Sequence, residues 1–122
     1  MLLTQLEPMI KDIATVQAAT TTTPATILPY AYYAFNKDTA KAPPYIVYLS
    51  PGRSDLFADD LNYKQILDLD IELYTKTKRY DLETVIEANM KAAGLAYSKT
   101  ESVIESDGVF MITYATEVLI NG

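Results

Sequence analysis

The sequence has 122 residues, the length of one domain, and its 49% apolar and 21% charged residues suffice for a hydrophobic core. It contains no histidine and no cysteine, which excludes Ser-His-Asp and Cys-His catalytic groups, disulfides, and the common zinc and non-haem iron sites. Its net charge of −6 disfavours a basic surface for binding nucleic acid.

Apolar residues near the N-terminus recur at spacings of three and four, which predicts an amphipathic helix over about 3–18. Thr4 and Glu7 have the spacing of a capping box, so the helix would begin near Gln5; a start at Pro8 is the alternative. We expect its apolar face to pack on the core, and the alternative is that part of this face docks on another subunit. The apolar positions are Leu2, Leu3, Leu6, Met9, Ile10, Ile13 and Val16.

Segments 27–35 and 45–49 are rich in β-branched and aromatic residues and predict two strands. Pro29 would place the start of the first strand at an edge or a bulge, and Pro51 with Gly52 would end the second. Five of the ten tyrosines lie in these strands, as half-buried sheet residues or, alternatively, at a protein–protein interface. They are Tyr30, Tyr32, Tyr33, Tyr45 and Tyr48.

Residues 53–61 show no clean periodicity, which predicts an exposed loop. Leu56 and Phe57 are apolar residues within it. They would either tuck under the loop as a small cluster or anchor a partner. The candidate residues for contact with a partner are Arg53, Asp55, Leu56, Phe57, Asp59 and Asp60.

Strict alternation within 62–78 predicts a half-buried antiparallel strand, in which apolar Leu67, Leu69, Ile71 and Leu73 alternate with Asp68, Asp70 and Glu72. The three carboxylates would share one face of the sheet, roughly 7 Å apart between neighbours, and would repel one another. Compensation would come from a lysine on a neighbouring strand, such as Lys99, from a divalent cation, or from a basic partner surface.

This acidic row has three interpretations. It is a solvated sheet face paired with cross-strand lysines, an intersubunit salt-bridge or lumen surface, or a metal-dependent hydrolytic site completed by Asp59 and Asp60. The four glycines build no phosphate-binding loop. We therefore expect an interaction module with no catalytic residue, no metal and no cofactor.

A second helix is predicted from Asp81, as its N-cap, to Gly94, which would end it. Segments 95–105 and 109–120 predict two further strands, joined by a turn at Asp107-Gly108. The order α-β-β-β-α-β-β predicts an α+β fold, with an antiparallel or mixed sheet of about five strands and two helices packed on it. We expect one domain over 1–122, with the sheet and second helix in 27–120.

Several segments, taken in order from about 27 to 118, give the sequence a resemblance to a known family. They are Pro29–Phe35, Ala42–Tyr48, Asp70–Thr75, Ala93–Glu101 and Val109–Tyr114. The sequence resembles small tail proteins of the tail-terminator or tail-completion type, which are encoded by long-tailed phages and prophages of Gram-positive bacteria. The shared motifs are structural, namely strand aromatics and a helix stop.

This resemblance implies a homohexameric ring on the last ring of the tail tube, which stops tube polymerisation and offers the surface that joins the head. It implies no catalytic residues. The partners would be further copies of the chain, the major tail-tube protein and a head-completion or neck protein. DNA would only pass through the lumen, where six copies at −6 carry about −36 and would repel phosphates.

The alternatives are another neck protein (a head-closure or adaptor ring), a non-viral cytosolic protein-binding module, and a carboxylate-metal hydrolase. The sequence has no run of 18 apolar residues and no basic leader, so no membrane partner is expected. The expected location is the virion, at the junction of head and tail, after synthesis in the host cytoplasm.

Overall fold

The structure, a computed structural model, describes residues 2–18, 20–34, 42–58, 61–104 and 108–120. It has an α+β fold. The elements in chain order are η1 (Leu3–Gln5), α1 (Leu6–Ala14), β1 (Thr15–Gln17), β2 (Thr26–Ile27), β3 (Tyr30–Tyr32), β4 (Tyr45–Arg53), β5 (Leu56–Ala58), β6 (Leu61–Thr75), α2 (Tyr80–Ala92), β7 (Tyr97–Ile104) and β8 (Val109–Ile120).

The main sheet has the strand order β3-β4-β6-β8-β7 and is mixed, because β3 runs parallel to β4 while the other neighbours are antiparallel. β5 pairs with the first residues of β6, and β1 with β2 form a separate two-stranded sheet. The predicted fold class is therefore confirmed, with three short strands added to the expected order.

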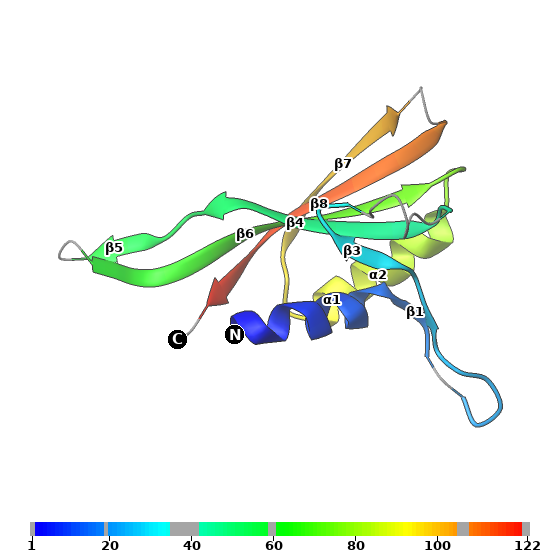
Figure 1. Ribbon diagram of the computed structural model, residues 1–122, viewed down its shortest axis with the longest axis horizontal. Coiled ribbons are helices and arrows are strands. Elements are labelled where there is room, and N and C mark those ends of the chain that lie inside the picture. Colours follow the sequence, from blue (N-terminus) through cyan, green and yellow to red (C-terminus); the bar gives the residue numbers. More distant parts are fainter. Residues whose placement is uncertain (1, 19, 35–41, 59–60, 105–107, 121–122) are drawn as a thin grey trace.

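Both long helices lie on one face of the main sheet (Figure 1). The alternation in β6 decides which residues meet them, since Leu69, Ile71 and Leu73 are fully buried. The same core cluster includes Ile10 and Ile13 of α1 and Ile86 and Met90 of α2. The other face of the sheet, here named the open face, carries the even-numbered residues of β6 from 66 to 74.

The N-terminal helix is shorter than the sequence predicts. A 3-10 turn begins at Leu3, the Gln5 side chain accepts a hydrogen bond from the Leu2 backbone N–H (2.7 Å), and α1 ends at Ala14. The Asn89 side chain of α2 donates to the carbonyl oxygens of Ile13 (3.0 Å) and Thr15 (2.9 Å). These bonds satisfy carbonyl oxygens that the end of a helix leaves without an intrahelical partner.

Two predicted strands have different bounds in the structure, and each difference lies at a proline. Segment 27–35 is split at Pro29, which has no backbone N–H, into β2 and β3. Pro51 does not end the second strand, because the pairing of β4 with β6 shifts register between Leu49 and Gly52 and then continues to Arg53. A bulge at this point accommodates a residue that cannot donate to the ladder.

The second helix begins two residues earlier than expected, at Tyr80, so the prediction of Asp81 as N-cap is wrong. The N-cap is Arg79, and Asp81 lies in the first turn, where its negative carboxylate interacts favourably with the positive end of the helix dipole. The predicted stop at Gly94 is confirmed: Gly94 has φ +78°, and the Leu95 N–H bonds back to the Met90 carbonyl (3.0 Å).

Candidate functional site

The acidic row lies on the open face of the sheet, as the alternation predicts. Asp68, Asp70 and Glu72 lie opposite Glu117, Ala115 and Thr113 of β8. Two of the three carboxylates accept hydrogen bonds from neutral hydroxyl groups instead of basic side chains. The Ser54 hydroxyl donates to Asp68 at 2.8 Å, and the Tyr74 hydroxyl donates to Glu72 at 3.0 Å.

Lys99 does not compensate this row, so that expectation is wrong. Lys99 pairs in register with Tyr114, which pairs with Ile71, and all three therefore belong to the face that carries the helices. The Lys99 ammonium lies 2.8 Å from Glu83 and 2.9 Å from Glu87, both on α2. Register across three strands, which a single-strand pattern does not contain, places the lysine on the opposite face.

A wide, shallow hollow of about 730 Å3 lies on the open face around two residues of the acidic row. Asp68, Asp70 and Glu117 supply carboxylates to its lining, while Ser98 and Ala115 supply small side chains. Among the described residues, no group of three or more acidic side chains is placed so that it could hold a metal ion. The hollow therefore offers a negatively charged contact surface.

The predicted loop at 53–61 is mostly strand in the structure. Arg53 ends β4, Leu56 and Phe57 lie in β5, and β5 pairs antiparallel with β6. The sequence shows no periodicity here because β5 has only three residues and pairs with β6 across a register shift. Asp59 and Asp60 lie outside the described residues.

Asp55 is a structural residue at the base of this hairpin, with a side chain that is 8% exposed. It accepts two hydrogen bonds from the Arg53 guanidinium, at 2.9 and 2.8 Å, and one from the Ile66 backbone N–H at 2.9 Å. The hydrogen bond to Asp55 raises the pKa of Arg53. Arg53 and Asp55 thus organise the turn between β4 and β5, whereas Leu56 is 51% exposed.

The tyrosines of the first strands are of two kinds. Tyr48 is buried, and Tyr30 donates to Glu7 of α1 at 2.5 Å, a bond that raises the pKa of Tyr30 to about 12. Tyr32 and Tyr33 are exposed and meet edge to face, with ring centroids 5.3 Å apart. Tyr30 and Tyr48 therefore pack in the sheet, as expected, whereas an interface formed by the exposed Tyr32 and Tyr33 stays a prediction.

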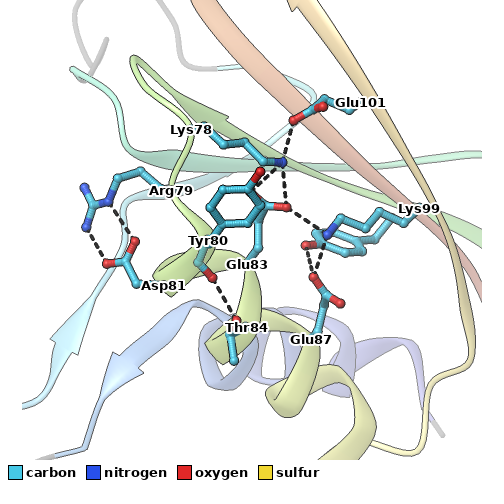
Figure 2. Close-up of polar contacts among 10 residues, drawn as sticks. Lys78, Arg79, Tyr80, Asp81, Glu83, Thr84, Glu87, Lys99 and Glu101 are labelled. Carbon is cyan, nitrogen blue, oxygen red and sulfur yellow. Dashed lines mark hydrogen bonds and ion pairs between the residues drawn. The ribbon is translucent and has the colours of Figure 1, made fainter.

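An ionic cluster that the sequence analysis missed joins α2 to β7 (Figure 2). Lys78 lies 2.9 Å from Glu83 and 2.5 Å from Glu101, and Lys99 lies between Glu83 and Glu87. The hydroxyls of Tyr97 (2.9 Å) and Tyr114 (3.0 Å) donate to Glu87. We name this group the Lys99 cluster; it comprises Lys78, Glu83, Glu87, Tyr97, Lys99, Glu101 and Tyr114.

The Lys99 cluster shifts the pKa values of its members. Burial of Glu83 and Glu87 disfavours their charged forms, but the hydrogen bonds they accept, foremost from Lys99, outweigh this and hold both pKa values below the ordinary one. Burial and the bond to Glu87 raise the pKa of Tyr114. The sequence signal was present, because Glu83 and Glu87 are four residues apart on one helix face.

No protein-family model matches the chain, and no curated protein matches its sequence at a significant level. Within the part of the chain that the structure describes, no helix is long and apolar enough to cross a membrane.

Proposed function

We propose that the protein is a structural component of a phage tail, of the tail-terminator type. Copies of the chain form a ring, most simply a hexamer, that caps the tail tube, stops its polymerisation and provides the surface that joins the head. The protein performs no catalysis in this role. The resemblance of its strand and helix-stop motifs to this family supports the proposal, together with the geometry of one projecting hairpin.

The hairpin of β5 and β6 is the observation that carries the proposal. Residues 65–75 of β6 pair with β8, and residues 67–74 of β6 pair with β4. Among the described strands, residues 61–64 of β6 pair only with β5. Figure 1 shows this two-stranded ribbon projecting beyond the helices. A two-stranded hairpin is at best marginally stable in water without further support. We infer that a neighbouring subunit supports it, with exposed Leu56 at the contact.

A closed ring requires a second surface that differs from the first, because its interfaces are head-to-tail. The open face provides a candidate, with Asp68, Asp70 and Glu72 on β6 and Glu117 on β8. These carboxylates either meet a cationic surface of the next subunit or line the lumen, where they repel DNA phosphates and let the genome slide. The protein would accordingly reside in the virion, at the junction of head and tail.

Electron microscopy of the purified protein mixed with tail-tube protein produced from the same genome tests this function. We expect rings at one end of each tube and tubes that stop lengthening. Density at the capsid portal in place of the tube end would identify a different neck ring, and the absence of binding to tubes or portals would leave a non-viral binding module. Either result contradicts the terminator function.

Two variants that each introduce one aspartate test the hairpin. Leu56→Asp should abolish ring formation on tubes, because it places a charge in the inferred subunit contact. Val103→Asp is the matched control, since Val103 on β7 is similarly exposed (54% against 51%). Unchanged ring formation by Leu56→Asp, with folding of both variants verified by circular dichroism, would exclude the hairpin from the interface.

The double variant Asp68→Lys with Asp70→Lys tests the acidic row. Reversing two charges should disturb either ring assembly, if the row lies between subunits, or DNA ejection, if it lines the lumen. If both processes continue at the rate of the parent protein, the row performs neither role.

A further inference from the structure

β7 is an edge strand, and Tyr97 is the one of its described residues that packs against the core cluster. The strand pairs with β8 from Tyr97 to Ile104, and no described strand pairs with its outer edge. Residues 98–103 are exposed, whereas Tyr97 packs against the core and meets Tyr114 edge to face at 5.2 Å. Elements with few buried apolar contacts open at the lowest free-energy cost.

The other described polar side-chain contacts between β7 and α2, apart from the hydrogen bond of Tyr97, are ion pairs. Lys99 of β7 lies between Glu83 and Glu87 of α2, at 2.8 and 2.9 Å. Glu101 of β7 is joined to the same Glu83 through Lys78, at 2.5 and 2.9 Å. Figure 2 shows these side chains converging between the helix and the strand. Two cations and three carboxylates therefore span the contact.

Glu83 and Glu87 are the central members; their described polar side-chain partners are cations and hydroxyl donors, and Glu83 shares Lys99 with the Glu87 carboxylate and Lys78 with the Glu101 carboxylate. Lys78 and Lys99 face Glu83, which is 3% exposed. Lys99, Tyr97 and Tyr114 face Glu87. Two tyrosine rings flank the cations, Tyr80 near Lys78 at 4.9 Å and Tyr114 near Lys99 at 5.9 Å. The hydrogen bonds and ion pairs of the two glutamates are strongest when both carboxylates are ionised.

We propose that the Lys99 cluster is an acid-sensitive tether, and that protonation of Glu83 and Glu87 releases the edge strand β7 from α2 while the rest of the sheet remains folded. A neutral carboxyl loses its attraction for ammonium groups. The lysine side chains are 28% and 36% exposed, so they regain water on release. β4, β6 and β8 keep their core contacts, which do not depend on charge.

The direction of the pH dependence follows from the two carboxylates. Because the pKa values of Glu83 and Glu87 lie below the ordinary glutamate value, their contribution is complete above about pH 4.5 and is lost as the pH falls through the lowered values. The tether concerns a single chain, and it stands whether or not the protein forms the proposed ring.

Hydrogen–deuterium exchange of the full chain, with Glu83→Gln and Glu87→Gln combined, tests the proposal. At pH 7 we expect amides of 97–104 to exchange about tenfold faster than in the parent protein, while exchange of β4 and β6 amides increases by a clearly smaller factor. Glu117→Gln is the matched control, since it makes the same chemical change at an exposed position of β8, on the face opposite the Lys99 cluster. It should leave exchange of 97–104 unaltered.

Two outcomes overturn the proposal. One is unchanged protection of 97–104 in the double variant, and the other is equal loss of protection in β6, which would make the cluster a general stabiliser. If the double variant does not fold, Lys99→Met takes its place. This variant keeps the aliphatic part of the side chain. We expect it to raise the exchange rate of β7 amides at pH 7 and to make the protection of these amides less dependent on pH. Protection that depends on pH as in the parent protein would refute the tether.

Discussion

Tyr114 combines full burial with a charged hydrogen-bond partner. It is 0% exposed, and its hydroxyl donates to Glu87 at 3.0 Å. We expect Tyr114→Phe to lower the free energy of unfolding by about 1–2 kcal/mol, since the lost bond is to a carboxylate that water partly reaches. Urea denaturation at pH 7 measures the change. Tyr80→Phe, at a residue 72% exposed, should stay within about 0.5 kcal/mol; equal losses in both variants would contradict this assignment.

Gly94 is required for its backbone conformation alone. Its φ is +78°, and a Cβ added there would meet no heavy atom within 4 Å. We expect Gly94→Ala to lower stability by about 1 kcal/mol, because an L-residue is strained in this region. Thermal denaturation followed by circular dichroism checks the loss.

Gly52→Ala is the control for Gly94→Ala. Gly52 has no positive φ, and its added Cβ would lie 3.8 Å from Asp68, an ordinary contact. Stability should remain unchanged or rise slightly, since alanine restricts the unfolded chain. A loss as large as that in Gly94→Ala would show that positive φ does not explain the effect at Gly94.

At the scale of the element, β6 separates the two faces of the sheet. Leu69 is fully buried beneath the helices, while Leu119 of β8 is 56% exposed on the open face. We expect Leu69→Ala to cost about 2–5 kcal/mol, from lost burial and the cavity left behind, and Leu119→Ala to cost under about 1 kcal/mol. Urea denaturation of the two variants makes the comparison, and similar costs would contradict the assignment of faces.

Elements were predicted well where one local signal dominated. The alternation of β6 and the glycine that ends α2 are such signals, and the structure confirms both. Prediction failed where a distant residue decided the outcome. Asn89, far along the chain, binds the carbonyl oxygens of Ile13 and Thr15 where α1 ends, and the hairpin at Leu56 forms on the part of β6 that extends beyond its other partners.

At the scale of the whole molecule, stability should fall in acid. The folded protein holds the pKa values of Glu83 and Glu87 below the ordinary glutamate value of about 4.5, so the unfolded state binds more protons as the pH drops. Their contribution is complete above that value and is lost as the pH falls through the lowered values. Urea denaturation between pH 7 and pH 3 measures the decline.

The variant Glu83→Gln separates this effect from general acid denaturation. It removes one titrating group, so the decline of stability with falling pH should become shallower. Glu117→Gln, at an exposed position on the open face, should leave the slope as in the parent protein. A slope that Glu83→Gln does not alter would mean that other carboxylates govern the acid response.

The sequence by itself determined the fold class, the buried face of β6 and the acidic row on the opposite face, because periodicity and turn residues act over a few positions. Only the tertiary structure decided which charges meet. Lys99 forms ion pairs with α2 and does not contact the acidic row. The register of β7, β8 and β6 determines on which face of the sheet each side chain lies. The two-stranded projection of β5 and β6 likewise depends on where neighbouring strands end, which no local pattern records.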